Sequence, residues 1–313
     1  MKPEILLVEP MMASIETALD RDYTVHRLPP PGEGRDRLLA EIAPRLRVIV
    51  TGGSTGASRA LMDALPALAL VAINGVGTDA VDLVEARRRG IRVTNTPDVL
   101  TDDVADLAMG LIVATLRRLA EADRFVRAGR WGPERMGLAR KVTGKRLGIF
   151  GLGRIGRAVA RRAAGFAMPL AYTSRTPVEG VDGRFVADLE ELARDSDVLV
   201  LTAAATAETR GIVGRRVLDA LGPDGVLINV ARGALVDEAE LVAALREGRL
   251  GGAGLDVFAD EPRVPPALFD LDSVVLVPHQ ASATLETRTA MGDLVLANVA
   301  AFLDGEELLT PVV

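Results

Sequence analysis

Histidine is scarce in this chain of 313 residues, which contains only His26 and His279. His279 follows an apolar run and a proline at the end of the last predicted strand. Open α/β folds bind their ligands at the carboxyl ends of their strands, and an imidazole there can donate a proton near neutral pH. We therefore predict that His279 is the proton donor for reduction of a carbonyl, and we place His26 on an ordinary strand surface.

An arginine and a glutamate follow the two preceding predicted strands. Arg232 lies in the segment Asn-Val-Ala-Arg-Gly at 229–233, and Glu261 lies near the end of the segment 254–262. The planar guanidinium of an arginine pairs with a carboxylate and can polarise an adjacent carbonyl, as a 2-oxo acid requires. A carboxylate beside the histidine would hold its ring and favour the imidazolium. Each residue alone is typical of a surface charge, whereas their joint placement at successive strand ends predicts a reacting centre.

A glycine-rich loop follows the apolar strand that ends at Phe150. Its glycines are Gly151, Gly153 and Gly156, and a helix is predicted over 154–164. In a dinucleotide-binding fold the first glycine permits a tight turn, the second lets the backbone approach a pyrophosphate, and the third lets helix and strand pack closely. The N-terminus of the helix then faces the anion. A tight turn without a ligand has the same pattern, but the six strands predicted in this part of the chain favour a bound cofactor.

The residues at the end of the next strand distinguish NAD from NADP. An acid there would bind the ribose 2′-hydroxyl and repel a 2′-phosphate. The chain has no acid at this point and instead has Ser174, Arg175 and Thr176, whose hydroxyls and guanidinium suit a phosphate. The alternative is a solvated loop arginine. We predict that NADP(H) is preferred and that NAD(H) can also be used.

Short apolar runs alternate with longer amphipathic segments along the whole chain. This alternation is typical of parallel sheets with helices on their faces, so the predicted fold class is α/β. Short helices are expected at 58–65 and 80–89, a long helical pattern spans 101–128, and a last helix spans 284–303. The predicted strands lie at 5–8, 23–26, 48–51, 70–73 and 91–94, then at 145–150, 170–174, 198–202, 225–230, 252–257 and 273–277.

The pattern predicts two doubly wound domains, one of which interrupts the other. The last helix has no strand after it, and we expect it to return to the first domain. The first domain would then comprise 1–97 and 286–313, and would bind substrate. Residues 98–285 would form an inserted domain that binds the dinucleotide.

The composition excludes several other classes of protein. A net charge of −6, spread along the chain, offers no basic face to nucleic acid or to an anionic membrane. The absence of cysteine excludes disulfides, thiolate catalysis and cysteine-ligated metals, and we expect no metal site. No apolar stretch approaches the length of a membrane span, and the N-terminus has no signal-type segment. We therefore expect a cytoplasmic protein that takes its redox chemistry from a cofactor.

Together, these motifs resemble those of the D-isomer specific 2-hydroxyacid dehydrogenases over essentially the whole chain. Within that family they are most similar to the NADP-dependent glyoxylate and hydroxypyruvate reductases. The resemblance implies a Rossmann domain inserted into a flavodoxin-like substrate domain, and a homodimer. The motifs that carry it are 74–79 (NGVGTD), 95–101 (NTPDVLT), the glycine loop, 229–233, 254–262 and 277–279 (VPH).

The resemblance also implies roles for the matched positions. Arg232 would bind the carboxylate and carbonyl of the substrate, His279 would donate the proton, and Glu261 would pair with His279. Backbone groups of Val76 and Gly77 would hold the substrate carboxylate. The cofactor would contact Thr101, Arg154, Ile155, Ala231 and Asp256, the last on the nicotinamide side.

Two positions depart from the family pattern. Segment 203–209 lacks the prolines usual beside the cofactor, and Gln280 stands where an apolar residue is more usual. In related reductases the region of Trp131 and Met136 joins the dimer interface and can reach the active site of the other subunit, so these two residues are candidates for the border of the substrate pocket. Two alternatives stay open at this point: an NAD-dependent dehydrogenase of a bulkier 2-hydroxy acid, and a regulatory NAD(P)-binding protein of the corepressor type.

Overall fold

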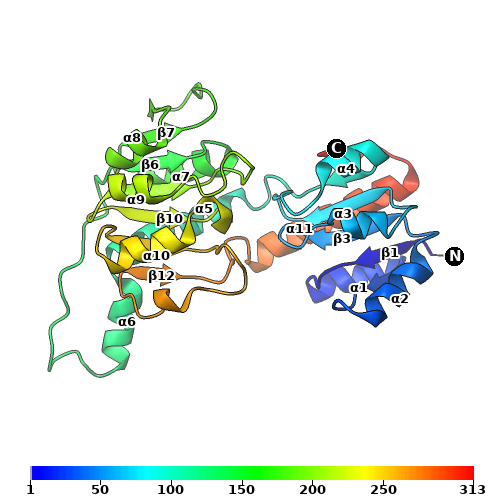
Figure 1. The fold of residues 1–313 in the computed structure, drawn as a ribbon, viewed down its shortest axis with the longest axis horizontal. Helices are drawn as coiled ribbons and strands as arrows, with labels where there is room; N and C mark the ends of the chain where they lie inside the picture. Colours follow the sequence, from blue (N-terminus) through cyan, green and yellow to red (C-terminus); the bar gives the residue numbers. More distant parts are fainter. Residues whose placement is uncertain (1) are drawn as a thin grey trace. The chain divides into compact units, whose positions relative to one another are not determined.

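The structure is a computed structural model that describes residues 2–313, and the chain forms two compact units (Figure 1). The first unit extends to Leu100 and resumes at Ala283–Val313, and the second comprises Thr101–Ser282. The domain borders expected from the sequence lie within a few residues of these positions. All the strand pairs of both sheets are parallel, which confirms the predicted α/β class.

A five-stranded sheet forms the centre of the first unit, in the order β2-β1-β3-β4-β5. This is the strand order of flavodoxin-like folds. Successive residues of a strand face opposite sides of the sheet, so Ile5 and Leu7 join one core and Leu6 joins the other. The strands are β1 (Glu4–Leu7), β2 (Thr24–Arg27), β3 (Val48–Gly52), β4 (Leu70–Asn74) and β5 (Arg92–Thr94).

Helices cover both faces of this sheet. The face of Ile5 and Leu7 is covered by α1 (Ala13–Asp22) and α11 (Leu285–Asp304), so the last helix of the chain lies in the first unit. The other face is covered by α2 (Glu33–Ile42), α3 (Arg59–Asp63) and α4 (Leu83–Arg89). Helix α4 begins three residues later than predicted, because the Asp82 side chain accepts a hydrogen bond from the Glu85 N–H and caps the helix there.

Seven strands form the sheet of the second unit, in the order β12-β11-β10-β9-β6-β7-β8. The six predicted strands are all present. The additional strand, β8 (Arg184–Phe185), was not predicted because two residues are too few to give an apolar run. It pairs with β7 and completes the strand order of a dinucleotide-binding fold. The others are β6 (Leu147–Phe150), β7 (Leu170–Thr173), β9 (Val198–Leu201), β10 (Val226–Asn229), β11 (Gly252–Leu255) and β12 (Val274–Leu276).

The helices of the second unit also lie on both faces of its sheet (Figure 1). On one face α5 (Thr101–Leu116) packs against α7 (Arg154–Ala164) and against β10 and β11. The other face is covered by α8 (Leu189–Arg194), α9 (Arg215–Leu221) and α10 (Glu238–Arg246). No helix within residues 2–313 is long and apolar enough to cross a membrane.

The prediction of one helix over 101–128 is wrong. Arg118 adopts a left-handed backbone conformation with a φ of 52°, and this break separates α5 from α6 (Leu119–Arg127). The Arg118 guanidinium pairs with the Glu121 carboxylate in the first turn of α6, at 2.5 Å. The ion pair joins two residues that both suit a helix, so their types alone gave no sign of the break.

Candidate active site

The three residues predicted to form the reacting centre follow three neighbouring strands. Arg232 follows β10, Glu261 follows β11 and His279 follows β12, and these strands are adjacent in the sheet. The His279 Nδ1 and Glu261 Oε2 atoms lie 2.6 Å apart. Arg232 is close enough for its charge to contribute to lowering the pKa of Glu261. The structure thus brings together three ionisable residues far apart in sequence.

The Glu261 carboxylate is held from two sides. Oε1 accepts the Phe258 N–H at 3.0 Å, and Oε2 contacts His279. Burial raises the pKa of this carboxyl, but the hydrogen bonds from His279 and Phe258 and the charges of His279 and Arg232 outweigh it, so the net pKa is lowered. Glu261 is therefore a carboxylate near neutral pH. It accepts the Nδ1 proton of His279. Because Nδ1 is engaged in this way, Nε2 is the ring nitrogen that remains available to a substrate.

His279 lies in a strained turn that Asp256 holds. Its φ of 48° is in the left-handed region, which is uncommon for a residue other than glycine. The Asp256 carbonyl accepts the His279 N–H at 2.8 Å, and the carboxylate accepts the N–H groups of Gln280 and Ala281 at 2.7 and 3.1 Å. The Asp256 side chain is fully buried, and this burial raises its pKa despite the two backbone donors. The predicted contact of Asp256 with the nicotinamide stays a prediction, while its carboxylate orients the turn of His279.

A buried asparagine organises the turn that carries Arg232. The Asn229 side chain donates to the Arg232 carbonyl at 2.9 Å and accepts the Ala231 N–H at 3.1 Å. The turn continues into a 3-10 helix at Gly233–Leu235. A Cβ atom at Gly233 would overlap the carbonyl group of Phe258, so the Arg232 turn packs directly on the loop that bonds Glu261. Asn229 was part of a sequence motif, but no role was predicted for it. The only feature of the sequence that could have indicated this role is a polar residue at the end of an apolar strand.

The three glycines of the predicted phosphate loop differ in their surroundings. A Cβ atom at Gly151 would lie 2.5 Å from the Ala203 nitrogen, and the φ of Gly151 is 101°. Both the lack of space and the backbone conformation therefore exclude a side chain at this position. A Cβ atom at Gly156 would overlap the Gly151 carbonyl oxygen, whereas nothing lies within 4 Å of one at Gly153. The first and third glycines therefore serve packing, and the second leaves open space at the N-terminus of α7, where Arg154 and Ile155 begin the helix. These features fit a dinucleotide pyrophosphate.

The segment expected to bind the adenosine ribose follows β7. The Ser174 hydroxyl donates to the Thr176 carbonyl at 2.6 Å and closes a tight turn, with Arg175 exposed. After β9, Thr209 stabilises the proline-free segment 203–209, because its hydroxyl donates to the Ala204 carbonyl at 3.0 Å and accepts the Thr206 N–H at 2.8 Å. A threonine turn thus orders the segment without the prolines usual in the family.

In the first unit, the predicted carboxylate-binding segment is held by Asn95. The Asn95 side chain donates to the Val76 carbonyl at 2.9 Å. In a trans peptide the carbonyl and the following N–H point in opposite directions, so this bond directs the Gly77 N–H away from Asn95. Sequence reasoning used Asn95 only as a motif residue.

His26 lies on the edge strand β2, as predicted, but its side chain makes a specific contact there. Its Nε2 atom lies 2.8 Å from Glu4 Oε2, and Glu4 Oε1 accepts a hydrogen bond from Arg45 at 2.6 Å. The His26 and Glu4 side chains are half-buried. The hydrogen bond from Arg45 is the largest cause of the lowered pKa of Glu4, which His26 lowers further against the effect of burial. The group links neighbouring strands β1 and β2 and has a structural role.

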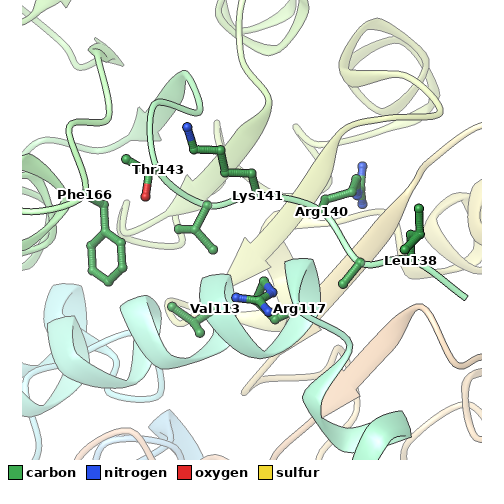
Figure 2. A pocket seen from close by; sticks show the side chains of 9 residues that line it. Val113, Arg117, Leu138, Arg140, Lys141, Thr143 and Phe166 are labelled. Atoms are coloured by element: carbon green, nitrogen blue, oxygen red, sulfur yellow. The ribbon is translucent and has the colours of Figure 1, made fainter. Parts of the chain in front are cut away.

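A hollow of about 530 Å³ lies elsewhere in the second unit (Figure 2). Phe166 and Val113 contribute apolar surface, and three cations surround it: Arg117, Arg140 and Lys141. Residues 141–143 precede the start of β6, and Phe166 follows the end of α7. In a parallel sheet these positions lie at the amino edge of the strands, opposite the edge that carries Arg232, Glu261 and His279. The hollow is therefore separate from the candidate active site.

Comparison with known proteins agrees with this geometry. Residues 109–281 match the model of the D-isomer specific 2-hydroxyacid dehydrogenase NAD-binding domain. The chain is 51% identical to hydroxyphenylpyruvate reductase of Plectranthus scutellarioides and 50% identical to glyoxylate/hydroxypyruvate reductase A of Arabidopsis thaliana, each over 99% of this chain and 98% of the relative.

Solved structures lead to the same family. The structure of an NADPH-dependent glyoxylate/hydroxypyruvate reductase from Sinorhizobium meliloti, in complex with NADP and malonate, matches with a TM-score of 0.93 at 44% identity, covering 100% of this chain and 97% of that one. The residues that match the family model include the glycine loop and the three strand ends described above. The chain belongs to the D-isomer specific 2-hydroxyacid dehydrogenase family.

Proposed function

We propose that the protein is an NADP(H)-dependent reductase that converts a small 2-oxo acid, such as glyoxylate or hydroxypyruvate, to the D-2-hydroxy acid. The observation that carries this proposal is the 2.6 Å contact between Glu261 and His279 at the carboxyl edge of the sheet whose strand β6 leads into the glycine loop. A histidine held in this way is suited to give a proton to a reduced carbonyl. The names of the relatives support the substrate class.

Each ionisable residue of the site has one task in the proposed reaction. When bound, the reduced nicotinamide supplies a hydride to the 2-oxo carbon. Arg232 pairs with the substrate carboxylate and polarises the carbonyl, and the backbone of Val76 and Gly77 binds the same carboxylate. His279 gives its Nε2 proton to the carbonyl oxygen as negative charge develops there, and Glu261 keeps the ring oriented and stabilises the imidazolium before transfer. Solvent then returns a proton to His279.

The proposed cofactor site extends from the glycine loop to the strand ends. Gly151, Gly153, Gly156, Arg154 and Ile155 would hold the pyrophosphate. Ser174, Arg175 and Thr176 would bind the 2′-phosphate, because hydroxyls and a guanidinium replace the carboxylate that favours NAD. Thr101, Ala231 and Asp256 would contact the rest of the dinucleotide.

Steady-state rates with both cofactors test the proposal. We expect NADPH to exceed NADH severalfold or more in kcat/KM with glyoxylate or hydroxypyruvate. Arg175→Ala should narrow that ratio, whereas the control Arg216→Ala, at an exposed arginine paired with Glu190, should not. Equal or better use of NADH by the wild-type protein would contradict the assignment of NADP. Absence of turnover with every 2-oxo acid would favour a regulatory protein instead.

One observation favours a second candidate, reduction of a bulkier 2-oxo acid. The relative that is 51% identical to the chain is a hydroxyphenylpyruvate reductase. An aromatic 2-oxo acid therefore belongs in the substrate panel. A kcat/KM for hydroxyphenylpyruvate above the values for glyoxylate and hydroxypyruvate would replace the small substrate with the aromatic one and leave the chemistry of His279 unchanged.

We also propose that the protein is a homodimer formed through α6 and the segment that follows it. The large apolar side chains there are exposed in the single chain, with Trp131 at 77% and Leu138 at 97%. Leu138 also lines the hollow of Figure 2, so a second copy could cover both. Burial of such groups is the main favourable term in association. Whether Trp131 or the half-buried Met136 then borders the active site of the second copy stays a prediction.

A further inference from the structure

We infer that Glu9 determines substrate specificity, by selecting 2-oxo acids whose side chains are uncharged and carry hydroxyls and by excluding those with a second carboxylate. The inference rests on the proposed function, because it requires that the substrate carboxylate binds at Val76 and Gly77. It concerns a residue of the first unit that the proposed reaction does not use.

The Glu9 carboxylate lies on a glycine of the neighbouring strand. Glu9 follows β1, and Gly52 is the last residue of β3, which pairs with β1. A Cβ atom at Gly52 would lie 2.7 Å from Glu9 Oε2 and still closer to Oε1. Any side chain at Gly52 would therefore displace the carboxylate. The Thr55 hydroxyl donates a hydrogen bond to Oε2 and fixes its position.

The next glycine connects this carboxylate to the proposed substrate-binding segment. A Cβ atom at Gly53 would lie 3.4 Å from the Gly77 carbonyl oxygen and 3.8 Å from the Gly77 nitrogen. The backbones of the two loops are thus in close contact. Gly52 approaches the Glu9 carboxylate and Gly53 approaches Gly77, so a single dipeptide contacts both groups. The carbons of a substrate beyond its carbonyl would extend from Gly77 within reach of the field of Glu9.

The charge of Glu9 is not neutralised by an ion pair. Within residues 2–313, no lysine, arginine or histidine lies at ion-pair distance from its carboxylate, and Thr55 is its hydrogen-bond donor. A carboxylate has about four acceptor positions and no donor. It can accept hydrogen bonds from substrate hydroxyls, and it repels a second carboxylate. Glu9 therefore favours monocarboxylic 2-oxo acids, and among those that have a side chain it favours the ones that carry a hydroxyl.

The substitution Glu9→Gln removes the charge and keeps the size of the side chain. We expect the ratio of kcat/KM for oxaloacetate to that for glyoxylate to rise roughly tenfold, as two like charges about 6 Å apart at intermediate dielectric would give. The ratio for hydroxypyruvate over pyruvate should fall. The control Glu33→Gln, at an exposed residue in the first turn of α2, should leave both ratios at the wild-type values. Melting temperatures would verify that each variant is folded.

The outcomes separate this inference from the proposed function. Unchanged ratios in a folded Glu9→Gln protein that still reduces glyoxylate would overturn the role of Glu9 and leave the proposed function intact. A wild-type protein that reduces no 2-oxo acid would overturn both. The wild-type protein offers a second measurement: discrimination against oxaloacetate should weaken at high ionic strength because salt screens the repulsion, and an unchanged ratio would also count against Glu9.

Discussion

Gly233→Ala should inactivate the enzyme although it adds only one methyl group. The new Cβ atom would overlap the carbonyl carbon and oxygen of Phe258 and the nitrogen of Ala259, all far closer than the 3.4 Å at which ordinary contact begins. Relief requires the Phe258 loop or the Arg232 turn to move by about 1 Å. The Phe258 N–H bonds Glu261, which holds His279. A shift of about 1 Å at a reacting group can lower turnover roughly a hundredfold.

The assay is kcat for glyoxylate with NADPH, measured beside thermal melting. Overpacking of this kind costs about 1–3 kcal/mol of stability, so the melt must show that the variant is folded at the assay temperature. Gly34→Ala is the matched control, since nothing lies within 4 Å of its Cβ position in α2. A double-mutant cycle with Glu261→Ala then tests the route: Gly233→Ala should lower kcat much less in a protein that already lacks Glu261.

A folded Gly233→Ala protein with kcat within about threefold of the wild type would refute this reasoning. It would mean that the two loops separate without disturbing Arg232 or Glu261. Full additivity in the cycle would refute the narrower claim that the effect passes through Glu261, because independent sites add their free energies.

Three further predictions follow from the described contacts. Asn95→Ala should raise the KM for glyoxylate about tenfold with a smaller change in kcat, because the Val76 carbonyl loses its donor, and an unchanged KM would argue against a substrate role for Gly77. Because folding lowers the pKa of Glu261, its carboxylate stabilises the folded protein at pH values above the ordinary pKa of 4.5, and this stabilisation is lost as the pH falls from 4.5 through the lowered pKa. The melting temperatures of the wild type and Glu261→Gln should therefore converge in acid. A difference that stays constant with pH would contradict the ion pair. Light scattering should give twice the chain mass for the wild type and a shift toward the monomer for Trp131→Ser, whereas a monomeric wild type would end the dimer proposal.

The sheets were predictable because their strands are buried on both faces. A fully buried parallel strand needs a continuous apolar run, and runs such as those at 198–201 and 226–229 stand out in the sequence. The placement of Arg232, Glu261 and His279 was predictable for the same reason, since a residue that follows such a run within a few positions lies near the carboxyl edge of the sheet. The break at Arg118 and the two-residue strand β8 leave no comparable pattern.

The residues that position the site were not predictable from the sequence. Asp256 orients His279 through N–H groups 24 and 25 residues away, and Asn95 bonds a carbonyl 19 residues away. Neither contact leaves a periodic signal, because each depends on how two loops fold against each other. The same holds for Glu9, whose significance comes from glycines more than forty residues further along the chain.

The most direct test of the central claim is His279→Asn, measured for both turnover and NADPH binding. The substitution removes the proton donor, and turnover should fall by about a hundredfold or more, while the affinity for NADPH stays near the wild-type value. His26→Asn, at the other histidine of the chain, is the control and should keep wild-type turnover. A His279→Asn protein with turnover near the wild type would show that the proton comes from elsewhere and would contradict the account.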